Sequence, residues 1–208
     1  MLTIARQPGD DAEAPLELRI EQAQLNTEGQ QHLQTARIAC ARDAIATPRS
    51  WEYTSSFIGP EGDEMPNLRV ERSVDTPPEG PVAAHWGLFE AVQRLPFEEG
   101  LEHSFDVLDC LDARKTGHTL RYDGAHEIRF GTDTQTLHRF VQTGHGALPF
   151  EYWLDGHHRL VLVVSEYRVY VLDAAAVDTF QQAHESQQSR YERLKQRYAP
   201  DTEDDDGE

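Results

Sequence analysis

The residues with the clearest capacity for chemistry are histidines, and seven of the ten in this 208-residue chain fall between His103 and His158. An imidazole beside a carboxylate can act as a general base, and imidazoles are also common metal ligands. His118 and His126 are the candidates, each acting singly with a nearby carboxylate. They support one alternative function for the chain, a metal-assisted or acid–base hydrolase.

Spacing argues against one metal ion shared by these two histidines. No His-Glu-x-x-His motif is present, because Phe130 stands where a second histidine would follow His126. A three-residue hairpin loop at 123–125 would pair Tyr122 with His126 and leave His118 four positions away on the same face. At about 3.3 Å per residue this separation is roughly 13 Å, too far for one ion. We therefore predict no metal and no cofactor.

Other motifs with catalytic potential give no assignment. The chain lacks Gly-x-Ser-x-Gly, so no serine nucleophile can be named. Residues 144–146 read Gly-His-Gly, but they lack the third glycine and the following helix of a phosphate-binding loop. Three aspartates spaced by three could hold a hard cation if they lay on a helix, although solvated acids are the preferred explanation. They are Asp106, Asp109 and Asp112. We name no catalytic residue.

The charge balance is strongly acidic, with 37 acidic and 19 basic residues and a formal net charge of −18. Nucleic acids and anionic membranes attract clustered Lys and Arg, so we expect neither as a partner. No apolar run approaches the ~18 residues of a membrane span. The first residues lack the apolar stretch of a secretory signal, which predicts a cytoplasmic protein. An envelope location would require a leader that has been removed.

The two cysteines, Cys40 and Cys110, are too few for a disulfide scaffold or a thiolate metal site. Apolar neighbours flank each of them, which predicts buried free thiols. A single bridge between them is the alternative.

Alternating apolar and polar residues predict four strands in an antiparallel meander. The strands cover residues 16–21, 36–40, 51–57 and 68–74, and glycine-containing turns separate them. We expect the chain to divide into a mobile lead-in, a single domain and an acidic disordered tail. These three parts cover residues 1–15, 16–199 and 200–208.

Helical spacing replaces this alternation in three segments. The first covers residues 82–95 and ends at Pro96. The second is a short helix over 104–113. The last covers 174–198, and its narrow apolar stripe either packs on the sheet or pairs with a second copy as a homodimer.

A second hairpin is predicted at Asp155. A three-residue loop over 155–157 pairs Tyr152 with Leu160 and makes one face apolar. On the opposite face Trp153 lies beside Arg159 and forms a cation–π pair.

The last two predicted strands, 161–164 and 169–172, are apolar on both faces, which is typical of the most buried strands of a sheet. Together the elements indicate an α+β fold. A strongly curved antiparallel sheet of about eight to ten strands, a half-barrel, packs on helix 82–95, and a C-terminal helix follows.

Aromatic residues gather on faces predicted to point inward. We therefore expect a non-enzymatic binding or scaffold protein, whose sheet holds an apolar small molecule or a protein segment. An ordinary hydrophobic core would explain the same residues. The predicted ligand-binding set is Trp51, Tyr53, Phe57, Trp86, Phe89, Tyr122, Phe150 and Tyr152.

Three segments in the second half of the chain resemble uncharacterised bacterial β-rich proteins. They are residues 117–124, 144–155 and 163–173, and the stretch that contains them, 117–173, is about a quarter of the chain. The resemblance implies a curved antiparallel sheet around a helix, loosely similar to lipoprotein carriers of the cell envelope. It implies no catalytic residues.

Overall fold

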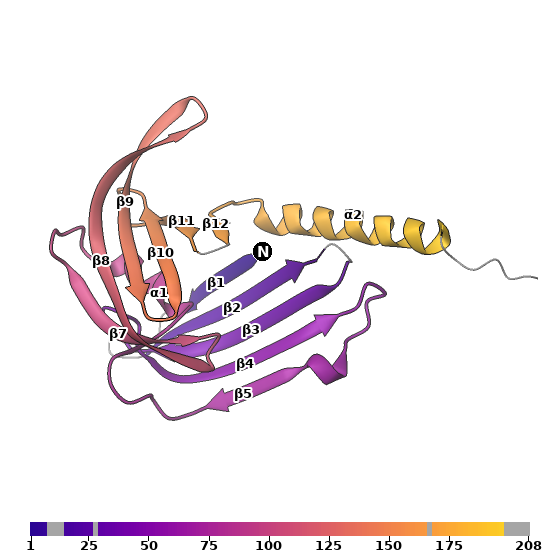
Figure 1. Ribbon diagram of the computed structural model, residues 1–208, viewed down its shortest axis with the longest axis horizontal. Helices are drawn as coiled ribbons and strands as arrows, with labels where there is room; N and C mark the ends of the chain where they lie inside the picture. The colour runs from indigo at the N-terminus through magenta and orange to yellow at the C-terminus, as the bar shows by residue number, and fades with distance from the viewer. Residues whose placement is uncertain (8–14, 27–28, 166–167, 198–208) are drawn as a thin grey trace, which may run out of the picture.

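Two β-sheets make up most of the computed structural model, which describes residues 1–7, 15–26, 29–165 and 168–197 (Figure 1). The first sheet has five strands in the order β1-β2-β3-β4-β5, and neighbouring strands run antiparallel. Its strands are β1 (Leu2–Gln7), β2 (Leu16–Leu25), β3 (Gln31–Cys40), β4 (Pro48–Ile58) and β5 (Val70–Val74). A 3₁₀ turn, η1 (Pro66–Leu68), precedes β5.

The second sheet has seven strands in the order β12-β11-β10-β9-β8-β7-β6. Its β6–β7 pair is parallel and the other pairs are antiparallel. Its strands are β6 (Val82–Ala84), β7 (Glu102–Asp109), β8 (Ala113–Phe130), β9 (Asp133–Gly144), β10 (Ala147–Leu154), β11 (Leu160–Val164) and β12 (Val169–Val171). The fold is thus α+β with a strongly curved, half-barrel sheet and a C-terminal helix, as predicted. The strands divide into two sheets rather than one.

Alternation in the first sheet places one apolar row against the interior. Leu18 lies opposite Ile38, and Ile38 lies opposite Trp51 on the next strand. All three side chains are buried, which stabilises the sheet by roughly 1.5–3 kcal/mol for each. The four predicted strands and their antiparallel order are confirmed, except that the last begins at Val70 and not at residue 68, because Leu68 belongs to η1.

The N-terminal segment contributes a strand that the sequence did not predict. Residues 2–7 form β1 at the edge of the first sheet, where Ile4 lies opposite Ile20. They belong to the segment predicted as a mobile lead-in. Residues 8–14 and the predicted acidic tail, 200–208, lie outside the described residues.

The helix predicted over 82–95 is shorter than expected. Residues 82–84 form the buried strand β6, and the helical part consists of α1 (Gly87–Ala91) and the 3₁₀ turn η2 (Val92–Arg94). A short run of fully buried apolar residues fits a strand and a helix equally well, which explains the error.

The short helix predicted over 104–113 is wrong, because this segment contains strand β7 and the turn that follows it. An irregularity in the pairing between Phe105 and Val107 allows both Val107 and Leu108 to be buried, and the resulting spacing imitates a helix. The β7–β8 turn has positive φ angles of 48° at Cys110 and 56° at Leu111. Such a turn normally carries Asn, Asp or Gly, so the sequence gives no signal for it.

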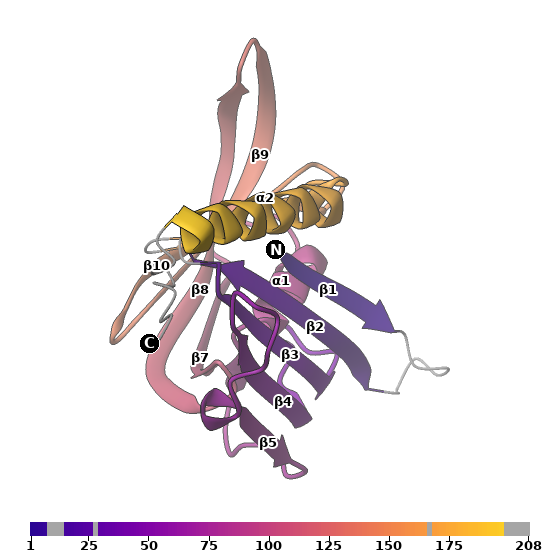
Figure 2. The ribbon, with the colours of Figure 1, turned by 90° about the vertical axis from the view of Figure 1, so that its right-hand side faces the viewer.

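The hairpin loop predicted at 123–125 is also wrong. Strand β8 continues through these residues, and Gly124, at φ 105°, marks an irregularity in its pairing with β9. The chain turns at residues 131–132 instead. Beyond Gly124 the two strands form an arm that extends far past the rest of the molecule in both views (Figures 1 and 2).

The hairpin at Asp155 is confirmed in place, but its register differs from the prediction. Tyr152 lies opposite Val163 rather than Leu160, and the pairing shifts between Trp153 and Leu154. The cation above the Trp153 ring is Arg139, with its guanidinium carbon 5.1 Å from the ring centroid. The predicted partner, Arg159, instead donates to Asp155 at 3.0 Å.

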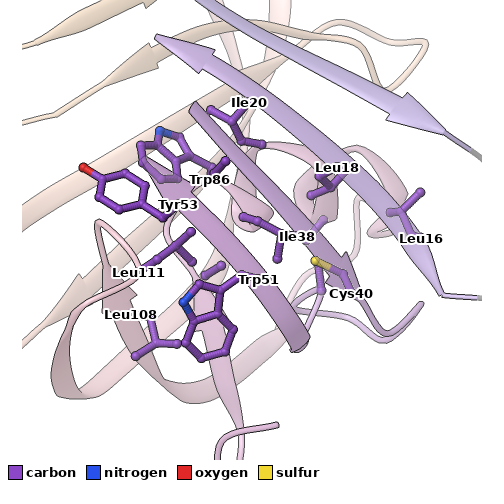
Figure 3. Close-up of a cluster of buried hydrophobic side chains, with 14 of the residues drawn as sticks. Leu16, Leu18, Ile20, Ile38, Cys40, Trp51, Tyr53, Trp86, Leu108 and Leu111 are labelled. Carbon is purple, nitrogen blue, oxygen red and sulfur yellow. The ribbon is translucent and has the colours of Figure 1, made fainter. Parts of the chain in front are cut away.

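Helix α1 lies between the two sheets and joins two hydrophobic cores. One core lies against the first sheet and includes Trp51, Tyr53 and Trp86, whose side chains gather with Leu18 and Ile38 in Figure 3. The other lies against the second sheet and includes buried rings from α1, β7, β9 and β10. These rings are Phe89, Phe105, Phe140 and Tyr152.

The C-terminal helix α2 (Ala176–Arg197) runs beside one end of the β1–β2 pair (Figures 1 and 2). None of its described residues is buried, so neither a sheet nor another helix of the described chain covers it closely. Near its far end, Lys195 forms an exposed ion pair with Glu61. Within the part of the chain that is described, no helix has the length and apolar character needed to cross a membrane.

Both cysteines are free thiols in the structure. Cys40 is buried as predicted, and burial raises the pKa of its thiol to about 12. Cys110 is exposed on the β7–β8 turn, which corrects the prediction that both thiols are buried.

Candidate functional site

A large groove, about 1090 Å³ in volume, opens between the two sheets. Leu2 and Ile4 of β1 line one side, and residues 160–163 and 169–172 line the other. Phe180 of α2 also contributes. Since β1 and β12 are the edge strands of their sheets, the groove lies between two open sheet edges.

The far wall of the groove corrects one sequence prediction. Residues 169–172 were predicted to be among the most buried, yet Val169, Val171 and Leu172 are 61%, 65% and 55% exposed. Among the described residues, strand β12 pairs only with β11 and forms one edge of the second sheet. All three residues line the groove, and their side chains are largely open to solvent.

A buried charge cluster lies at the groove beneath β1. The carboxylate of Glu90, on α1, is only 7% exposed and accepts hydrogen bonds from the Arg94 guanidinium at 2.9 and 3.1 Å. Arg6 lies 3.6 Å from the same carboxylate. Arg94 also donates to the backbone carbonyls of Arg42 and Asp43. The cluster fixes α1 to the loop after β3 and keeps a buried acid neutralised.

A second, smaller pocket of about 100 Å³ adjoins the groove. The two spaces share Gln22, Arg168 and Tyr170 as lining residues. Both spaces are lined by apolar and polar side chains. The polar ones include His85 and His118 in the small pocket, and four arginines in the groove, which are Arg6, Arg94, Arg159 and Arg168.

A directed hydrogen-bond chain ends at His118. The Tyr152 hydroxyl donates to the Gln142 amide oxygen at 2.7 Å, and the Gln142 amide nitrogen lies 3.1 Å from Nδ1 of His118. His118 is 2% exposed, and burial lowers its pKa, so the imidazole is neutral at neutral pH. The partner of this histidine is thus an amide and not the carboxylate that a general base requires.

Charged and titratable groups also line the small pocket. The Lys115 ammonium lies 2.8 Å from the Asp109 carboxylate. Burial alone would raise the pKa of Asp109, but its hydrogen bond to Lys115 and the charge of His85 outweigh this effect and lower it. Burial among aromatic rings lowers the pKa of His85 to about 4.

The other predicted acid–base residue, His126, has a carboxylate nearby. Its Nε2 lies 3.5 Å from Asp123, but that carboxylate accepts a hydrogen bond from Arg139 and pairs with Arg121. Neither His126 nor Asp123 lines the groove or the small pocket. Among the described residues, no group of three or more His, Cys, Asp or Glu side chains could hold a metal ion.

The eight predicted ligand-binding aromatics all lie on inward faces, but they do not form one lining. Five are buried and are divided between the two cores: Trp51, Tyr53, Trp86, Phe89 and Tyr152. Phe57, Tyr122 and Phe150 are half-buried. Of the whole set, Phe89 lines the groove, while Trp86 and Phe150 line the small pocket.

Sequence reasoning missed the residues that form most of the groove. These residues come from β1, β11, β12 and α2. In two of these elements, β12 and α2, the sequence carries an apolar pattern that could have indicated the groove. Residues 169–172 are apolar on both faces, and Phe180 belongs to the apolar stripe of α2. Nothing local showed that β12 lies at a sheet edge.

Comparisons of the chain with known protein families, with characterised proteins and with solved structures found no match. The architecture therefore defines the class by itself. This is an α+β protein with a half-barrel sheet, a large groove between two sheet edges and a small pocket beside it.

Proposed function

We propose that the protein is a non-enzymatic binding protein that holds an apolar, chain-like small molecule in the groove. The observation that carries the proposal is the exposure of Val169, Val171 and Leu172 on the wall of a groove of about 1090 Å³. Small-molecule sites are usually apolar hollows of roughly 300–1,000 Å³, so the volume suits a ligand. Exposed apolar side chains gathered at one place on a protein surface favour a binding site.

The shape of the groove favours a chain over a compact ring system. Its lining extends from Leu2 of β1, across the ends of β11 and β12, to Phe180 and Gln187 of α2. A flexible apolar chain can follow such an extended surface and cover several separate side chains. The same proposal accords with the resemblance to lipoprotein carriers, which stays a prediction.

Binding should depend on the β12 wall of the groove. We expect Val171→Glu to weaken the binding of the neutral fluorophore N-phenyl-1-naphthylamine by about tenfold or more, because a carboxylate must then be buried against the ligand. Fluorescence titration, with decan-1-ol as a competitor, measures the effect. Val171 is 65% exposed, so the substitution leaves the cores intact.

The matched control is Leu68→Glu. Leu68 is 48% exposed on η1 and does not line the groove, so the same change of charge should leave the affinity as it is. Equal affinities for the unmodified chain and Val171→Glu would contradict the proposal, as would the failure of the unmodified chain to bind either probe.

A homodimer through helix 174–198 stays a separate proposal. In its favour, Val177 and Leu194 are exposed, and none of the described residues of α2 is buried. Pairing with a second copy would cover this stripe. We expect sedimentation velocity at two well-separated concentrations to show a shift towards the dimer that Leu194→Glu abolishes. A single monomeric species at both concentrations would contradict it.

A further inference from the structure

The arm formed by β8 and β9 has an open edge along β8. Beyond Gly124, strand β8 pairs with β9 in a regular register as far as Phe130. Strand β7 pairs with β8 no further along than Arg121. Among the described residues, 125–130 therefore have a strand neighbour on the β9 side alone. The arm extends beyond the rest of the ribbon (Figures 1 and 2), so this edge is accessible to the edge strand of another chain.

One face of the arm carries apolar side chains that are partly open to solvent. His126, Ile128 and Phe130 alternate along β8, so they share this face. Phe130 is 45% exposed, and Ile128 is half-buried. A two-stranded ribbon alone is only marginally stable in water, and further strands that share an apolar face stabilise it. The arm therefore gains most from a partner that adds strands to it.

The sequence of the open edge is complementary to itself. Two exposed residues of opposite charge, Glu127 and Arg129, flank Ile128. When two copies of this strand pair antiparallel about a twofold axis at Ile128, Glu127 of each copy lies opposite Arg129 of the other. The axis placed at Glu127 or at Arg129 would instead put two like charges opposite each other, which is destabilising. Charge thus selects the register with Ile128 at its centre.

The apolar face is continuous in the same register. Phe130 of each copy lies opposite His126 of the other, and the two Ile128 residues lie opposite each other on this face. The edge of β9 has no comparable pattern, because Asp133 is the one charged residue in the stretch 133–136. Pairing of two β9 edges along this stretch would therefore form no ion pair, which favours the β8 edge.

We propose that the β8 edge of the arm is an interface between two copies of this chain. The copies pair antiparallel through residues 126–130 about a twofold axis at Ile128, and they form one four-stranded sheet in the order β9-β8-β8-β9. Because each copy uses the same edge, the contact is closed and leads to a dimer. It involves neither the groove nor α2, so it is independent of the functions proposed above.

Single charge reversals test the register. Glu127→Arg and Arg129→Glu each place like charges opposite each other twice, so we expect either variant to weaken the dimer by about tenfold or more in sedimentation velocity. An equimolar mixture of the two variants should regain the dimer, because their charges are then opposite at both positions. Glu79→Arg is the matched control, since it makes the same change at an exposed loop position and should leave association unchanged.

Cysteine cross-linking tests the twofold axis, in a Cys110→Ser background that removes the exposed thiol. Directly opposed Cα atoms of antiparallel strands lie about 4.5–5.5 Å apart, which suits a disulfide bond. We expect Ile128→Cys to form a disulfide-linked dimer on mild oxidation, as seen by non-reducing electrophoresis. Phe130→Cys should not, because its two copies would lie four positions apart, roughly 13 Å.

Three results would overturn the arm interface. They are a monomer at every concentration, a mixture of the two charge variants that stays monomeric, and equal cross-linking of Ile128→Cys and Phe130→Cys. A dimer that Leu194→Glu abolishes but Glu127→Arg leaves intact would also overturn it and assign the association to α2. These outcomes concern self-association alone, so the proposed ligand groove is tested separately.

Discussion

Gly144→Ala should destabilise the protein by about 3 kcal/mol, through overpacking combined with loss of a buried hydrogen bond. A Cβ atom at this position would lie 2.4 Å from Cγ and Nδ1 of the His118 ring. Because that ring is 2% exposed and bonded to Gln142, it cannot move aside without breaking the hydrogen-bond chain. Urea denaturation followed by circular dichroism measures the change in the free energy of unfolding.

Two comparisons isolate this contact. Gly156→Ala introduces the same methyl group where no atom lies within 4 Å of the new Cβ, so its effect should stay within about 0.5 kcal/mol. In a His118→Ala background the clash is absent, and Gly144→Ala should then cost much less than it does in the unmodified chain. Equal costs in the two backgrounds would show that His118 is not the neighbour that matters.

Acidification should destabilise the protein through His85. Burial lowers the pKa of His85 from 6.5 to about 4, so between these values the unfolded chain binds a proton that the folded chain does not. The stabilising contribution is complete above pH 6.5 and is lost as the pH falls towards 4. Lowering the pH from 7.5 to 5 should therefore remove about 2 kcal/mol of stability through this residue alone.

Burial also lowers the pKa values of His32, His118 and His138, so their contributions have the same sign. The control for His85 is His85→Gln, which does not titrate and should lose less stability on acidification. His157→Gln, at an exposed hairpin tip, should retain the full pH dependence. Parallel losses for the unmodified chain and His85→Gln would refute the assignment to His85.

The sequence predicts the first sheet well because its alternation is regular and its faces differ. Leu16, Leu18 and Ile20 are buried and alternate with more exposed residues, and the same pattern recurs on β3 and β4. A shift of one residue in the pairing of two strands would turn every apolar side chain towards solvent. The alternation of apolar residues therefore determines the register of the pairing. The fold class follows from this regularity and from the two helical segments.

The errors arise where a residue type serves an unusual role. Asp123-Gly124 is a typical hairpin signal, but here Gly124 accompanies a pairing irregularity inside a continuous strand. Conversely, Cys110 and Leu111 make a real hairpin turn with positive φ angles that their side chains disfavour. Tertiary packing decides both cases, and a local pattern carries no information on it.

The candidate site was less predictable than the fold. The groove is formed by residues that are remote in sequence, from Leu2 and Ile4 to Phe180, and it exists because two sheet edges face one space. Sequence reasoning identified His118 as a residue with chemical potential, but it paired that residue with a carboxylate. The structure supplies the Gln142 amide instead, 3.1 Å from Nδ1 of the ring.

The arm formed by β8 and β9 gives the protein a natural attachment point for protein engineering. Between Gly124 and residues 131–132 its strands pair with each other, and the arm extends beyond the rest of the ribbon in both views (Figures 1 and 2). No residue of this part of the arm lines the groove. Residues inserted into an exposed hairpin loop add only a small entropic cost of loop closure. A fluorescent label or an affinity tag placed at Gly131 would therefore report on the protein while leaving both hydrophobic cores and the groove undisturbed.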